Sequence, residues 1–144
     1  MILVSACLAG TCCRYDGCSN LVEEIRHLVE AGEAIPVCPE VEGGLPTPRI
    51  PSELQGGHVI NRNGKDVTEE FVRGAKKCLR ICRENHCTQA VLKARSPSCG
   101  KGKIYNGNFE KVLIDGDGIF ARMLLDEGIE VLTEEEFLSG AFLH

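Results

Sequence analysis

The chain has 144 residues, nine of them cysteine, and a formal net charge of −5. Its length indicates one domain with a substantial core, and no apolar run is long enough to span a bilayer. The acidic balance argues against a protein that holds nucleic acid on a broad basic face. We therefore expect a cytoplasmic protein without membrane contact, in which thiols stay reduced.

The first third of the chain predicts two strands joined by a helix. Residues 2–5 form a short apolar run that is typical of a buried strand. Asn20 and Glu23 predict a capping box at the start of an amphipathic helix that ends at Gly32. Residues 34–37 predict the second strand, which begins directly after that helix.

A long helix and a third strand follow in the middle of the chain. Asp66 and Glu69 predict another N-terminal box, for a helix from residue 68 to about residue 86. Cys78 and Cys82 lie on its apolar stripe, where cysteine usually acts as a small core residue. Residues 90–93 predict the third strand.

The last third continues the alternation of helix and strand. Residues 118–128 predict a helix, residues 129–132 a fourth strand, and Thr133 with Glu136 a cap for a last short helix. Regular alternation favours a parallel sheet covered on both faces. We therefore predict an α/β fold over residues 1–144: a single three-layer, Rossmann-like domain with a mostly parallel four-stranded sheet and helices on both faces.

Two stretches interrupt this pattern. Residues 43–65 are rich in glycine and proline and predict a long irregular excursion. Residues 101–117 contain Asn106-Gly107, a hairpin signal, and predict a small hairpin insertion. Long loops inside a compact domain are usually functional, so we expect both stretches to fold over the site.

Three cysteines each follow a different predicted strand. Cys7 follows the first strand, Cys38 the second, and Cys99 the third by a few residues. Ligands in open parallel α/β sheets bind beyond the carboxyl ends of the strands, so these thiols should converge at one edge of the sheet. Three thiolates there could hold zinc or an iron–sulfur cluster.

Carboxylates, hydroxyls and fixed positive charges lie in the same loops as these cysteines. A metal with a candidate base and hydrogen-bond donors beside it has the composition of an active site. The candidates are Glu40, Asp16, Ser96, Ser98, Arg14 and Arg49.

Other cysteines remain open as ligands. Cys13 is the main alternative to the three named thiols because it lies close to Cys7 in the sequence. Cys12 and Cys18 flank it and could compete for iron or zinc, although a solvated loop thiol is the simpler interpretation. Cys87 has no assigned function.

Four motifs, in order, resemble the thiouracil desulfidase (desulfurase) family, which was formerly a family of unknown function. The resemblance covers essentially the whole chain. It rests on Ser-Ala-Cys-Leu at residues 5–8, Cys-Arg-Tyr-Asp-Gly at 13–17, Cys-Pro-Glu at 38–40 with Gly-Gly-Leu-Pro-Thr-Pro-Arg at 43–49, and Ser-Pro-Ser-Cys-Gly at 96–100.

The resemblance implies a [4Fe-4S] cluster whose ligands, by motif position, are Cys7, Cys38 and Cys99. The iron without a protein ligand would capture the sulfur of a thiolated pyrimidine, with no net redox change. Glu40, with Asp16 as second choice, would activate water, and Ser98 or Ser96 would hold the ring or its developing charge. The implied partners are a small thiolated base or nucleoside and cluster-assembly proteins.

A second hypothesis comes from a different functional class. The cysteines could belong to a zinc-binding or sulfur-carrying module that stores metal or persulfide without catalysis. Zinc could also replace iron in protein prepared in air. Desulfidation after anaerobic reconstitution separates the two hypotheses, because only the enzyme turns over.

Overall fold

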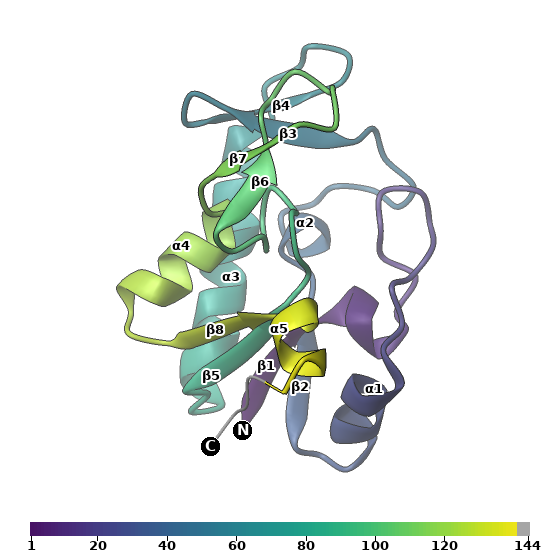
Figure 1. The fold of residues 1–144 in the computed structure, drawn as a ribbon, viewed down its shortest axis with the longest axis vertical. Coiled ribbons are helices and arrows are strands. Elements are labelled where there is room, and N and C mark those ends of the chain that lie inside the picture. Colours follow the sequence, from purple (N-terminus) through teal and green to yellow (C-terminus); the bar gives the residue numbers. More distant parts are fainter. Residues whose placement is uncertain (141–144) are drawn as a thin grey trace.

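The computed structural model describes residues 1–140. Its centre is a four-stranded sheet of β1 (Ile2–Ser5), β2 (Ala34–Val37), β5 (Gln89–Leu92) and β8 (Glu130–Thr133), in the order β2-β1-β5-β8 (Figure 1). Every neighbouring pair is parallel, and the ends of β1 and β2 are level. The chain segments that follow these strands therefore leave the sheet at one edge.

Helices cover both faces of the sheet, which confirms the three-layer prediction. On one face lie α1 (Glu23–Glu30) and α5 (Glu134–Leu138), which pack against one set of alternate strand residues. On the other face lie α3 (Thr68–Glu84) and α4 (Ile119–Asp126), which pack against the other set. Among the described helices, none has the length and apolar character needed to cross a membrane.

Short elements lie at and beyond the carboxyl edge of the sheet. The 3-10 helix η1 (Ala6–Ala9) follows β1, and α2 (Pro39–Glu42) follows β2. Two hairpins, β3 (Ser52–Gln55) with β4 (His58–Asn61) and β6 (Lys103–Tyr105) with β7 (Leu113–Asp115), lie above this edge (Figure 1).

Both interrupting stretches contain a hairpin, although the sequence predicted one only in the second. The region predicted to be irregular contains the β3–β4 hairpin, whose two loop residues, Gly56 and Gly57, have φ values of 57° and 86°. Positive φ at both positions matches the tight turn that suits strand twist, so the glycine pair was a turn signal and not only a loop signal. At Asn106-Gly107 a hairpin does form, but its loop is longer, at residues 106–112.

Of the three predicted capping boxes, only the one at Thr133 forms, where the hydroxyl accepts a backbone N–H at 3.1 Å. Val22 occupies the N-cap of α1, and the Asn20 side chain instead accepts a hydrogen bond from a loop arginine. At α3 the N-cap is Val67, and Asp66 accepts the N–H of the first helical residue at 2.8 Å. At α1 the arginine competes for the Asn20 side chain, and at α3 the Asp66 carboxylate bonds the N–H of Thr68 and not that of Glu69.

The backbone of α2 lies directly against that of α3. A Cβ atom added at Gly74 would lie 1.7 Å from the carbonyl oxygen of Pro39, and one added at Gly43 would lie 2.0 Å from that of Glu70. No side chain separates the two helices at these points. The contact therefore fixes where α2, and the Cys38 that precedes it, lie relative to the sheet.

The substitution Gly74→Ala should destabilise the protein by at least about 2 kcal/mol, because an overpacked methyl group must push α2 away from α3. Urea denaturation would measure this free energy of unfolding. The matched control is Lys77→Ala, an exposed position of the same helix, which should change it by less than about 0.5 kcal/mol. Equal stability of the two variants would contradict the close contact.

Candidate active site

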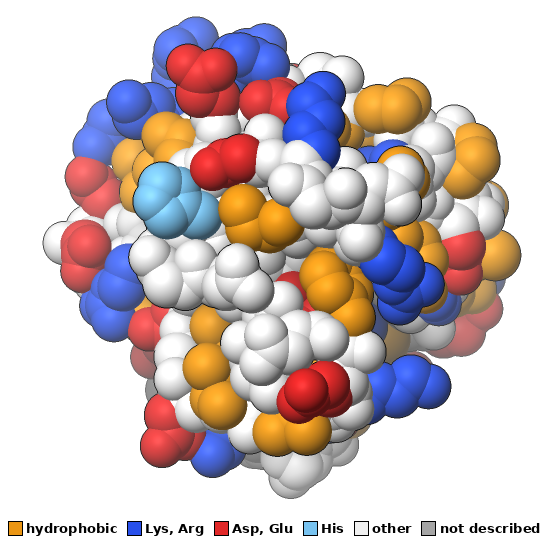
Figure 2. All heavy atoms as spheres, turned by 90° about the horizontal axis from the view of Figure 1, so that it is seen from above, with side chains coloured by type: hydrophobic (Ala, Val, Ile, Leu, Met, Phe, Trp, Pro, Cys, Tyr) orange, Lys and Arg blue, Asp and Glu red, His pale blue; other side chains and the backbone are white. Residues whose placement is uncertain are grey.

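A cavity of about 460 Å³ opens at the carboxyl edge of the sheet. Its walls come from the segments that follow β1, β2 and β5 and from both hairpins, as expected for the two interrupting stretches. Figure 2 looks onto the end of the molecule that carries the hairpins, where basic and acidic side chains are interspersed among apolar ones. This volume suits a small molecule.

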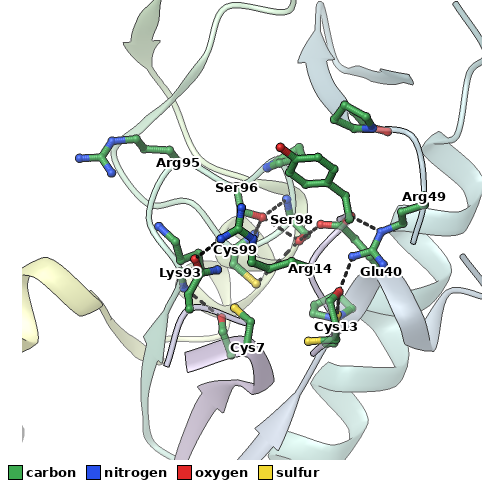
Figure 3. A pocket seen from close by; sticks show the side chains of 18 of the residues that line it. Cys7, Cys13, Arg14, Glu40, Arg49, Lys93, Arg95, Ser96, Ser98 and Cys99 are labelled. Atoms are coloured by element: carbon green, nitrogen blue, oxygen red, sulfur yellow. Dashed lines mark hydrogen bonds and ion pairs between the residues drawn. The ribbon is translucent and has the colours of Figure 1, made fainter. Parts of the chain in front are cut away.

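Four thiols line the cavity. Cys7, Cys38 and Cys99 lie around it, as the strand topology predicts, and Cys13 lies there as well. In Figure 3, Cys7 and Cys99 lie near each other, and Cys13 lies to one side of them, below Glu40. Cys12 and Cys18 are exposed and are not among the described residues that line it. The structure therefore separates Cys13 from the other two cysteines of its segment.

Hydrogen bonding among the thiols divides them into donors and acceptors. The Cys13 thiol donates to Cys38 and lowers the pKa of Cys38 to about 7, and a hydrogen bond from Cys13 likewise lowers the pKa of Cys7. The pKa of Cys13 itself is raised, because it holds the proton that both neighbours use. Burial raises the pKa of Cys99. Cys7 and Cys38 are therefore the thiols closest to the metal-binding thiolate form.

The Glu40 carboxylate lies between two partners in the same cavity. It is in α2, and its Oε1 accepts a hydrogen bond from Arg49 Nε at 3.0 Å. Its Oε2 accepts one from Ser98 Oγ at 3.1 Å, a contact between α2, which follows β2, and the loop that follows β5. The carboxylate is thus oriented from both sides (Figure 3).

Ser96 and Ser98 have different positions in this network. Ser96 Oγ accepts the backbone N–H groups of Ser98 and Cys99 at 3.1 and 3.0 Å, so it shapes the loop that carries the cysteine. The two hydroxyl oxygens are 3.0 Å apart. Ser98 Oγ also reaches Glu40, so Ser98 is the hydroxyl that links the cysteine loop to the carboxylate.

Asp16 lies outside the lining of the cavity, among the residues that the structure describes. Its carboxylate forms an ion pair with Arg14 at 3.0 Å and accepts the backbone N–H of Cys18 at 3.0 Å. Arg14 itself lines the cavity. Asp16 therefore shapes its own turn and orients Arg14, and Glu40 is the predicted carboxylate that the structure places beside the thiols.

Sequence reasoning missed the cavity residues of the hairpins. Glu53 in β3 accepts the backbone N–H groups of Gly107 and Phe109 at 3.0 and 3.1 Å, which joins the two hairpins. Arg62 stacks on the Phe109 ring, 5.3 Å from its centroid. These contacts join segments about 50 residues apart, and no local sequence pattern indicates them.

The donor set fits an iron–sulfur cluster. Thiolates are the usual protein ligands of such clusters, and here they come from separate loops around one cavity. Within residues 1–140, no three Cys, His, Asp or Glu side chains are gathered closely enough to coordinate one metal ion.

Comparisons with known proteins agree with this chemistry. The family of 2-thiouracil desulfurases matches residues 2–136. YbbK, an uncharacterized protein of Bacillus subtilis (strain 168), is 42% identical over 146 aligned positions, which cover 94% of this chain and 97% of YbbK. The solved structure of TudS, described as a [4Fe-4S]-dependent thiouracil desulfidase, is 47% identical with a TM-score of 0.91, covering 97% of this chain and 94% of TudS.

The low pKa of Cys38 makes its alkylation pH-dependent in the metal-free protein. A pKa lowered to about 7 leaves thiol below that pH and thiolate above it, so the rate of iodoacetamide modification should rise through pH 7 and level off above about pH 8. Mass spectrometry of the labelled peptides would follow it. Cys78, buried with a pKa raised to about 12, should stay unlabelled. A midpoint near pH 9 at Cys38 would contradict the assignment.

Proposed function

This chain belongs to the 2-thiouracil desulfurase family, and we propose that it removes sulfur from a thiolated pyrimidine by hydrolysis of the carbon–sulfur bond. The observation that carries the proposal is the shared cavity, in which cluster-type ligands and an oriented carboxylate–hydroxyl pair face the same space. Its volume of about 460 Å³ is suited to a free base or a nucleoside.

Cys7, Cys38 and Cys99 are the proposed ligands of a [4Fe-4S] cluster. Each follows a different strand of the sheet, and all three line the cavity. Cys13 is the alternative ligand, since its thiol hydrogen-bonds to Cys7 and Cys38. When bound by three cysteines, the cluster supplies one iron without a protein ligand, which can polarise the thione sulfur.

Glu40 is the proposed base. Arg49 already binds Oε1, so Oε2 is the oxygen that can take a proton from a water directed at the ring carbon. Ser98 Oγ, 3.1 Å from that oxygen, can donate to the substrate ring or pass a proton. The overall reaction converts C=S and water into C=O and hydrogen sulfide, so atoms balance and no electrons are exchanged.

Substitution of the base tests this role. Glu40→Gln should lower kcat on 2-thiouracil at least about 100-fold, because the amide keeps the shape but cannot accept the proton. Iron content should stay at the wild-type level. Release of sulfide by anaerobically reconstituted protein would measure the rate, with the exposed Glu110→Gln as the control carboxyl variant. Full activity of Glu40→Gln would exclude Glu40 as the base.

Substitution of a ligand tests the cluster. Cys99→Ser should lose most of the iron and the absorption near 400 nm after reconstitution, and turnover with them, because a thiolate ligand is removed. Cys12→Ser, at an exposed thiol outside the cavity, should keep all three. A wild-type protein that binds zinc or persulfide but never releases uracil would instead support the storage or carrier module.

A further inference from the structure

Arg49 is a buried guanidinium that contacts several segments around the cavity. Its side chain is only 6% exposed. Nε donates to Glu40 Oε1 at 3.0 Å, and Nη2 donates to the carbonyl oxygen of Cys13 at 2.8 Å. Nη1 donates to the carbonyl oxygen of Pro46 at 3.1 Å and to Thr47 Oγ1 at 3.0 Å.

These contacts use most of the hydrogen-bonding capacity of the side chain. A guanidinium has five N–H donors in a fixed plane, and four protein acceptors surround this one. Little of it remains to bind a substrate, although Arg49 lies in the wall of the cavity. Its effect on chemistry must therefore pass through the groups that it holds.

Two of those groups belong to the site. The ion pair with Oε1 turns the other carboxylate oxygen of Glu40 toward Ser98. The bond to the Cys13 carbonyl ties the segment after η1 to α2, and the backbone N–H of Arg49 donates to the carbonyl oxygen of Tyr15 in the same segment at 2.6 Å. One side chain thus sets the position of the base and of a cysteine loop together.

We infer that Arg49 is a positioning residue for desulfidation: it orients the Glu40 carboxylate and holds the Cys13 segment against α2, without touching the substrate. This inference rests on the proposed function, in which Glu40 is the base. A lysine cannot replace the arginine, because a single ammonium group cannot present four donors in one plane.

Chemical rescue separates this role from a purely structural one. Arg49→Ala should keep wild-type iron content and absorption, lower kcat at least about 100-fold and change KM less than about 3-fold. Added guanidinium chloride should restore kcat at least about 10-fold. Glu40→Gln should not respond to guanidinium, and Arg83→Ala, which removes an exposed arginine of α3, should match the wild type.

Arg49→Lys is the second variant, in case Arg49→Ala does not fold. It keeps the positive charge but not the planar fork, so we expect normal iron content, kcat lowered at least about 10-fold and no rescue by guanidinium. Activity equal to the wild type in this variant would overturn the inference. A rise in KM with unchanged kcat in either variant would also overturn it, because Arg49 would then bind substrate directly.

The metal-free protein gives a readout that does not depend on turnover. Without its tether, the Cys13 segment should loosen, so iodoacetamide should label Cys13 at least about 5-fold faster in Arg49→Ala than in the wild type, and guanidinium should reverse the change. Unchanged labelling would overturn the tethering role. If the wild type releases no sulfide, the proposed function fails, and the labelling result still decides whether Arg49 holds this segment.

Discussion

The contact between the α2 and α3 backbones is the constraint on which the site depends. Gly43 and Gly74 let the two helices meet with no side chain between them, and close-packed backbone cannot adjust as a flexible side chain can. The buried apolar stripe of α3 packs on the sheet. The contact between α2 and α3 therefore fixes where Cys38 and Glu40 lie relative to the sheet. Chemistry at the cavity therefore relies on two glycines that do not line it.

Much of the fold and part of the site could be predicted because both follow from strand topology. Parallel strands end at one edge, so Cys7, Cys38 and Cys99 could be placed together from sequence positions alone. Cys13 was predicted only as an alternative ligand and Glu53 was not predicted at all, because their positions depend on loop conformation and on contacts between distant segments. The same limit explains why three candidate capping pairs with similar sequences produced a single box.

The two hairpins form one wall of the cavity because defined contacts connect them. Gly107 has a φ of 94°, and an added Cβ would lie 2.6 Å from the carbonyl oxygen of Leu54, so the loop lies tightly on β3. The Glu53 carboxylate and the stacked Arg62 and Phe109 pair add polar and aromatic contacts at the same junction. The hairpins, which lie outside the parallel sheet, therefore supply one polar and aromatic wall of the cavity.

The wide spacing of the thiols has a consequence for how the protein is made. Cys7, Cys38 and Cys99 are 31 and 61 residues apart in the sequence, and each follows a different strand. An unfolded chain therefore offers no compact chelate formed by these three residues, and they become neighbours only after β1, β2 and β5 have paired. If these three residues hold the proposed cluster, folding must come first and iron delivery second.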